Sequence, residues 1–354
     1  MKLSVPFSLY FIFSCIAFFL LGKLLLILGV NKRVYNYVPG ECSVIPNLDG
    51  VISFDSSADG LLFMSVNPHE NGSHGHIFTF NADNKTAFEV TPTNGLMKMM
   101  PQAISVISNK QSVHIMALNK RMKTTTLEMF RYLFEGKDPN HQRLKYIRTI
   151  QGQYLQRVYD IAAIDSSQFF MTTQFYFDYP MLQALETIFS LSTGSIAVYN
   201  GKKRYVLVKR FVTPTGILYD KYRNSVVVGS FARESVFLYD VGNRFKLTFK
   251  KEIKLGCSPS NLWADFDGSV IVACHSVLYR YFLHQFNNTM NLSPTSIVRI
   301  FPYNDQSNYT KISNLYSSDG ATIAGATTAA RSGRSLLIGN RKMILNCVWG
   351  DGLK

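Results

Sequence analysis

The chain has 354 residues, of which 47% are hydrophobic and 17% are charged. The apolar content is ample for one large domain with a buried core, and extended disorder is excluded. The net charge of +14 favours an acidic protein surface or anionic lipid headgroups as partner. Because no basic cluster is interleaved with stacking aromatic residues in a recognisable module, we expect no nucleic acid partner.

The first 30 residues form an apolar segment. No charge occurs from Leu3 to Gly22, and after Lys23 the apolar run resumes to Val30, long enough for a helix that crosses a bilayer. A cleaved signal peptide is the alternative, but the run is longer than a usual signal core and no small-residue cleavage site precedes residue 31. We therefore predict a retained signal anchor over 1–30 and a juxtamembrane linker over 31–41.

The basic flanks leave the orientation of this anchor open, because Lys2 lies on one side and Lys32 and Arg33 on the other. Sequons for N-glycosylation favour one answer, since they lie in polar loops after the anchor: Asn71, Asn84, Asn287, Asn291 and Asn308. We predict a single-pass membrane glycoprotein with a cytosolic N-terminus. Its C-terminal domain is expected in an oxidising luminal or extracellular space, in the endoplasmic reticulum and/or at the plasma membrane.

A two-strand pattern recurs after the linker. Its clearest copy has a polar turn at Asp265–Gly268, an apolar run at Val270–Cys274 and a second run at Val277–Phe282. β-branched and aromatic residues between turn formers predict two buried strands. Copies of the pattern begin near residues 60, 112, 167, 225, 269 and 335.

This spacing is close to that of four-stranded propeller blades. Six copies predict an all-β, six-bladed β-propeller over residues 42–354, and a closed ring would leave no long sheet edge exposed. An array of β-sandwiches is the alternative architecture.

One insertion interrupts the strand pattern. Met181, Leu182, Leu185, Ile188 and Phe189 fall at helical spacing after Pro180, which suits a first helical turn. We predict one amphipathic helix on a face of the ring. It either caps the blade beneath it or lies on a membrane or a partner.

The cysteines are placed informatively. Cys15 lies within the anchor, whereas Cys42 and Cys347 lie at the two ends of the folded part. A bond between these two would fasten the first segment to the last blade; two unrelated thiols are the alternative. Cys257 and Cys274 are then expected to be free and buried.

Several stretches, taken in order, resemble the paraoxonase/arylesterase family: Cys42, Pro101–Ser105, Tyr159–Ile161, Ala273–His275, and Leu336–Gly339 with Cys347. The resemblance covers about residues 40–348. It implies a six-bladed propeller, an N-terminal segment that is often retained, and a disulfide between the two terminal cysteines.

Enzymes of that family hydrolyse lactones and aryl esters with calcium at the floor of the central tunnel. The resemblance places the family's metal-ligand positions at Tyr159, Asp160, Thr215, Ser260 and Asn261, and positions of its catalytic groups at Gln102, Lys120 and His275. Most anionic ligands are therefore missing, and Lys120 adds a positive charge, so we expect no cofactor, or calcium only if the site is retained. Alternatively, Asp160, Asn261 and His275 satisfy buried backbone groups.

The chain resembles the nematode membrane-anchored paraoxonase-like branch more than it resembles the secreted esterases. That resemblance implies a non-catalytic chaperone or accessory subunit for membrane channels of the degenerin/ENaC type, with degenerin-type sodium channel subunits or another membrane protein as partner. Two other functions stay open: a calcium-dependent arylesterase or lactonase with an altered site, and a lipid-surface binder that uses the helix at Met181–Phe189.

Overall fold

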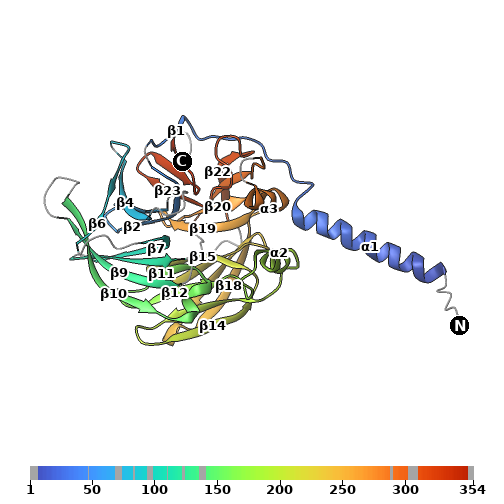
Figure 1. Ribbon diagram of the computed structural model, residues 1–354, viewed down its shortest axis with the longest axis horizontal. Coiled ribbons are helices and arrows are strands. Elements are labelled where there is room, and N and C mark those ends of the chain that lie inside the picture. The colour runs from blue at the N-terminus through green and yellow to red at the C-terminus, as the bar shows by residue number, and fades with distance from the viewer. Residues whose placement is uncertain are drawn as a thin grey trace.

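The computed structural model of the chain describes residues 7–46, 48–67, 74–82, 84–93, 99–109, 111–121, 124–134, 141–287, 290–301 and 310–349. Its strands form six sheets that are arranged as the blades of a ring, and a long helix projects from one side (Figure 1). The predicted all-β six-bladed propeller is therefore confirmed.

Each blade contains four main strands, and the second blade has one short extra strand, β6 (Thr91–Pro92). Blades 1 and 2 consist of β2 (Val51–Ser56), β3 (Leu62–Val66), β4 (His76–Asn81) and β5 (Thr86–Glu89), then β7 (Pro101–Ser108), β8 (Val113–Lys120), β9 (Thr125–Phe134) and β10 (Gln142–Gln151). Blades 3 and 4 consist of β11 (Val158–Ala163), β12 (Phe169–Thr173), β13 (Gly194–Tyr199) and β14 (Arg204–Phe211), then β15 (Pro214–Asp220), β16 (Ser225–Ser230), β17 (Ser235–Val241) and β18 (Leu247–Lys254). Blades 5 and 6 consist of β19 (Ser258–Ala264), β20 (Val270–His275), β21 (Thr295–Ile300) and β22 (Ile312–Ser318), then β23 (Thr328–Ser332), β24 (Ser335–Gly339), β25 (Ile344–Val348) and β1 (Cys42–Val44).

The first strand of every blade contacts the first strands of its two neighbours, so these six strands surround the centre. The repeats found in the sequence correspond to the second strands, which begin at residues 62, 113, 169, 225, 270 and 335. Apolar side chains fill the space between neighbouring blades, as where Phe63 and Ile77 of blade 1 pack against Ile115 and Phe130 of blade 2. The core is therefore a ring of interfaces between sheets.

The ring is closed by the N-terminal strand. β1 pairs antiparallel with β25, and Cys42 lies directly opposite Cys347 in this register. The two residues form a disulfide that closes a loop of 305 residues, with a Cα–Cα distance of 4.0 Å. The predicted terminal disulfide is confirmed.

The prediction that Cys257 and Cys274 are free is wrong, because these two residues form a second disulfide. β19 and β20 pair with Pro259 opposite Cys274, which leaves Cys257 diagonally across from its partner at a Cα–Cα distance of 5.5 Å. The register of these two neighbouring strands brings the thiols together, and this register cannot be read from the sequence. Two disulfides suit a luminal or extracellular domain.

In the described part of the chain two α-helices, and not one, are inserted between strands. α2 (Pro180–Ile188) lies between β12 and β13 and begins at Pro180 as predicted. α3 (Leu278–Phe286) lies between β20 and β21 and replaces the strand expected at Val277–Phe282. Leu278, Tyr281 and Phe282 have the spacing of one helical face, and a short aromatic run does not distinguish a helix from a strand.

α2 buries Glu186 and Thr187, whereas Met181 and Phe189 are 74% and 66% exposed. The Glu186 carboxylate accepts hydrogen bonds from the backbone N–H groups of Tyr176 and Phe177. These bonds hold the segment that leads into the helix. Leu185 is exposed as well, whereas Leu182 and Ile188 are half-buried. The helix therefore presents part of its apolar surface outward.

The projecting helix is α1 (Phe7–Leu28). Within the described residues it is the one helix long and apolar enough to cross a membrane. Its C-terminal end contacts α2 and α3 (Figure 1). The segment that follows, which we expected to be a linker, is held to the propeller: Tyr37 exchanges two backbone hydrogen bonds with Ser317, and Lys32 forms an ion pair with Glu234.

Candidate functional site

A cavity of about 520 Å³ lies at the centre of the ring. Its wall comes from the beginnings of the first strands and from the connections between the second and third strands, because both converge on one face of the propeller. α2 and α3 belong to these connections and supply Gln183 and Gln285 to the wall. The cavity therefore adjoins the part of the domain that contacts α1.

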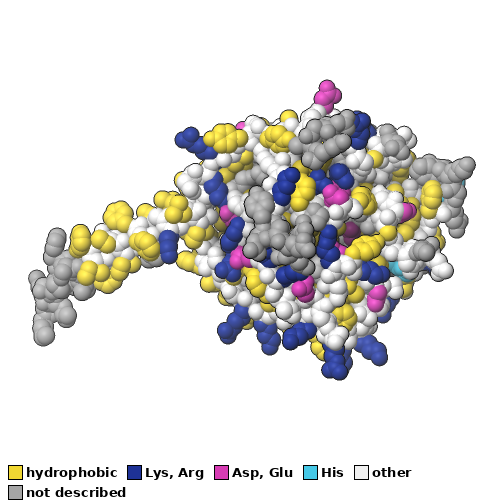
Figure 2. Space-filling view, turned by 180° about the vertical axis from the view of Figure 1, so that it is seen from behind, with side chains coloured by type: hydrophobic (Ala, Val, Ile, Leu, Met, Phe, Trp, Pro, Cys, Tyr) yellow, Lys and Arg dark blue, Asp and Glu magenta, His cyan; other side chains and the backbone are white. Residues whose placement is uncertain are grey.

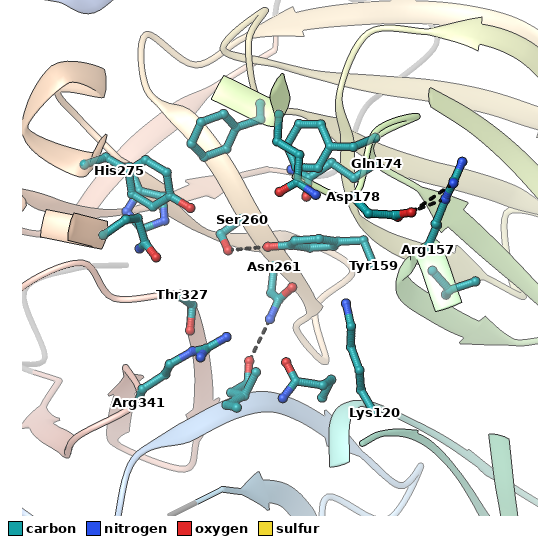
Figure 3. A pocket seen from close by; sticks show the side chains of 18 of the residues that line it. Lys120, Arg157, Tyr159, Gln174, Asp178, Ser260, Asn261, His275, Thr327 and Arg341 are labelled. Carbon is teal, nitrogen blue, oxygen red and sulfur yellow. Dashed lines mark hydrogen bonds and ion pairs between the residues drawn. The ribbon is translucent and has the colours of Figure 1, made fainter. Parts of the chain in front are cut away.

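The structure brings together six of the eight residues singled out as catalytic or metal-binding positions. Those that line the cavity are Gln102, Lys120, Tyr159, Ser260, Asn261 and His275. Figure 3 shows all of them with labels except Gln102. Asp160 and Thr215 are buried behind the wall and are not part of it.

The carboxylate of Asp160 is occupied by the backbone. One oxygen accepts a hydrogen bond from the Ile161 N–H and the other from the Ile217 N–H, both at 2.9 Å, which joins blade 3 to blade 4. Burial raises the pKa of Asp160 to about 7, although the two backbone donors oppose this rise. The hydroxyl of Thr215 likewise donates to the Pro259 carbonyl oxygen at 2.9 Å.

The floor of the cavity contains hydrogen bonds between blades. The Tyr159 hydroxyl lies 2.8 Å from the Ser260 Oγ, and burial raises the pKa of Tyr159. The Asn261 side chain donates from Nδ2 to the Ile52 carbonyl oxygen at 2.7 Å. The Oδ1 of Asn261 accepts no hydrogen bond from a described residue.

His275 is enclosed by aromatic rings. Its ring centroid lies 4.3 Å from that of Tyr281 and 5.8 Å from that of Phe231. Burial, with a smaller contribution from His284, lowers the pKa of His275 to about 3. The imidazole is therefore neutral at physiological pH and adds no charge to the cavity.

Positive charge dominates the lining. Lys120 ends β8, Arg341 lies between β24 and β25, and both side chains point into the cavity (Figure 3). Arg157 forms a two-point ion pair with Asp178, at 3.1 Å for both contacts. Burial and, to a smaller extent, the positive charge of Arg341 lower the pKa of Lys120, while the negative charge of Asp178 opposes this shift.

The lining does not fit a calcium ion, which needs several hard oxygen ligands and is usually held by carboxylates. Among the described lining residues Asp178 alone carries a carboxylate, and Arg157 binds both of its oxygens. Nowhere in the described part of the chain do three or more His, Cys, Asp or Glu residues gather in a way that could hold a metal ion.

Sequence reasoning missed several residues of the site, among them Arg341, Arg157, Thr327 and Phe231. Each lies beside the end of a second strand or the beginning of a first strand. The repeat pattern could have found them, because the same ends of all six blades converge on the centre.

These features define a six-bladed β-propeller protein with a polar central cavity, an N-terminal closing strand and one helix that could span a membrane. A family model described as Arylesterase matches residues 16–348. The chain thus belongs to the arylesterase family, and the resemblance found in the sequence is confirmed.

Several named proteins are similar in sequence to this chain over most of its length. Mechanosensory abnormality protein 6 of Caenorhabditis elegans is 27% identical, over 92% of this chain and 90% of its own length. Serum paraoxonase/arylesterase 2 of Bos taurus and serum paraoxonase/lactonase 3 of Homo sapiens are each 25% identical, over 88% of this chain and 89% of theirs. Among solved structures, a luciferin-regenerating enzyme aligns with a TM-score of 0.52 and 11% identity over 89% of this chain and 97% of its own, a likeness that concerns the fold alone.

Proposed function

We propose that this protein acts by binding, as a membrane-tethered chaperone or accessory subunit for channel subunits of the degenerin/ENaC type. The observation that carries the proposal is an apolar helical face where the anchor leaves the domain, beside a cavity whose lining does not fit the metal of the family's hydrolases. The similarity to a nematode protein named for a mechanosensory abnormality also supports a role with a membrane protein partner.

The apolar face is formed by α2, α3 and the residues just after them. Its exposed side chains, between 44% and 81% accessible, are Met181, Leu185, Phe189, Phe286 and Met290. Single exposed apolar residues are common on proteins, but a group beside one end of a membrane helix marks an interface. We assign it to the transmembrane or juxtamembrane part of a partner subunit, which the anchor would hold at the same depth.

A basic edge supplies a second contact. Lys and Arg gather along the lower rim of the propeller in Figure 2, the rim where the outer strands β14 and β18 lie in Figure 1. The exposed residues of this basic edge are Lys202, Lys203, Lys209, Arg210 and Lys246. Such residues also protect edge strands from unwanted pairing. In this proposal they attract an acidic ectodomain as well.

The test is co-expression of the full-length chain with a degenerin-type channel subunit, followed by co-purification and surface biotinylation of the channel. We expect Met181→Ser combined with Phe189→Ser and Phe286→Ser to reduce both readouts severalfold. Tyr222→Ser is the matched control, because Tyr222 is 97% exposed but lies in the turn between β15 and β16, outside the apolar face. Binding retained in a variant with the anchor exchanged, the apolar face changed and the basic edge neutralised would overturn the proposal.

The site of action we propose is the endoplasmic reticulum and/or the plasma membrane. A chaperone would meet its client in the endoplasmic reticulum, whereas a permanent subunit would travel with it to the surface. Fractionation of the co-expressed channel distinguishes the two.

A calcium-dependent arylesterase or lactonase is the second candidate, favoured by the family and by Asn261 and His275 in the cavity wall. Hydrolysis of phenyl acetate or a lactone by the purified full-length chain, dependent on added calcium and abolished by His275→Gln, would place this function first. Binding of α2 to lipid alone would appear instead as vesicle binding that Met181→Ser and Phe189→Ser remove without any effect on a channel.

A further inference from the structure

The described lining of the central cavity contains two cationic side chains that have no carboxylate partner. Among the described lining residues the cations are Lys120, Arg157 and Arg341, and only Arg157 has a carboxylate partner. No hydrogen bond or ion pair to a described residue is found for the side chains of Lys120 and Arg341, which reach into the cavity from blades 2 and 6 (Figure 3). Two like charges facing one space repel each other, and an anion between them would remove that cost.

Neutral polar groups with free bonding capacity lie in the same wall. The Nδ1 of His275 and the Oγ1 of Thr327 are buried, and neither has a hydrogen-bond partner among the described residues. His275 itself is only 2% exposed. Buried polar groups normally have partners, so these atoms point to a ligand that offers oxygen acceptors or a hydroxyl.

Aromatic side chains form part of the wall, and the space is limited. Phe175, Phe177, Phe231 and Tyr281 line the cavity, and Phe231 and Tyr281 lie with ring centroids 5.1 Å apart. A volume of about 520 Å³ lies within the range of small-molecule pockets. The cavity thus offers charge for an anionic head and rings for an apolar or aromatic body.

We propose that the central cavity is a binding site for a small organic anion, a carboxylate or phosphate attached to an apolar or aromatic group. Lys120 and Arg341 bind the anionic head, and Phe231 and Tyr281 pack against the body. The site lies beside the helices that contact α1, because both α2 and α3 contribute to its wall. This site goes beyond the proposed channel partnership and does not depend on it.

The test uses the full-length chain in detergent and measures binding of benzoate, phenyl phosphate and inorganic phosphate by titration calorimetry. Benzamide serves as the neutral match for benzoate. We expect benzoate and phenyl phosphate to bind, benzamide to bind at least about 10-fold more weakly, and binding to weaken with added salt. Preference for inorganic phosphate over phenyl phosphate would contradict the role assigned to the aromatic wall.

Variants locate the site. Lys120→Met and Arg341→Met should each weaken benzoate binding about 10-fold or more, whereas Lys120→Arg retains it and Lys202→Met on the basic edge has no effect. The thermal midpoint should stay the same or rise in Lys120→Met, because a repulsion is removed; a purely structural Lys120 would lower it. Equal affinity for benzoate and benzamide, or affinity unchanged in the Lys120→Gln and Arg341→Gln double variant, would overturn the proposal. Neither outcome changes the result expected in the co-purification and surface biotinylation assay with the channel subunit.

Discussion

The Tyr159 hydroxyl lies 2.8 Å from the Ser260 Oγ and joins the first strand of blade 3 to the first strand of blade 5, with blade 4 between them. The family resemblance assigns a metal-ligand position to each of these residues. Here the two side chains form a hydrogen bond with each other. A hydroxyl pair carries no negative charge, since burial raises the pKa of Tyr159, and here it links blade 3 to blade 5.

The contribution of this bond can be isolated with a double-mutant cycle. Tyr159→Phe and Ser260→Ala should each lower the free energy of unfolding, and the double variant should lose less than the sum, with a coupling of about 1 kcal/mol. Equilibrium unfolding of the four proteins measures it. Additive losses would show that the two hydroxyls do not interact.

The two disulfides should differ in their effect on stability. Replacing Cys42 and Cys347 by Ser opens a loop of 305 residues and should cost up to about 5 kcal/mol, whereas replacing Cys257 and Cys274 opens one of 17 and should cost about 3 kcal/mol. Thermal unfolding and mobility on non-reducing gels report both changes. A larger loss of stability on removal of the Cys257–Cys274 bond than on removal of the Cys42–Cys347 bond would contradict the role of the latter in closing the ring.

Asp160 should make the protein less stable as pH rises. Burial raises its folded-state pKa to about 7, above the unfolded value of about 3.9, so between these values the folded protein holds a proton that the unfolded chain has released. The contribution of Asp160 to the free energy of unfolding therefore falls from pH 4 to pH 7, by up to about 1.4 kcal/mol per pH unit. His275, whose pKa burial lowers to about 3, contributes a slope of the opposite sign over part of this range.

The Asp160→Asn variant should be less stable overall, because one backbone donor loses its acceptor, but its stability should vary less with pH. Asp55, whose pKa burial raises to about 6, titrates in the same range and leaves part of the slope. Thermal midpoints between pH 4 and pH 7.5 test this. Parallel profiles for the variant and the parent would contradict the assignment.

The luminal or extracellular placement of the domain predicts glycosylation. Asn84 and Asn287 are exposed and Asn291 is partly buried, while the sequons at Asn71 and Asn308 lie outside the described residues. We expect Asn84→Gln and Asn287→Gln each to reduce the mass lost on enzymatic deglycosylation. Asn243→Gln, at an exposed residue outside any sequon, should not, and a protein of unchanged mass after deglycosylation would place the domain on the other side.

Local patterns predicted much of this fold. The second strand of each blade could be located because apolar runs recur between turn formers, and ring closure gave a reason for pairing Cys42 with Cys347. α3 was missed because the aromatic run at Val277–Phe282 suits either a helix or a strand, and the bond between Cys257 and Cys274 depends on a strand register.

The cavity was predicted only in part. Lys120 and Ser260 could be proposed from the family pattern, but Arg341 reaches them from the last blade, 221 residues after Lys120. Such convergence is set by the closed ring and not by any local motif. For Asp160 the family pattern was misleading. Its position matches that of a metal ligand, but both of its carboxylate oxygens accept hydrogen bonds from backbone N–H groups.

The absence of a calcium site is tested most directly by a calcium titration of the purified full-length protein after removal of bound metal with a chelator. We predict no stoichiometric binding in the micromolar range, because the cavity presents Lys120 and Arg341 and no free carboxylate among its described lining residues. One calcium ion held tightly per chain, together with calcium-dependent ester hydrolysis, would contradict it.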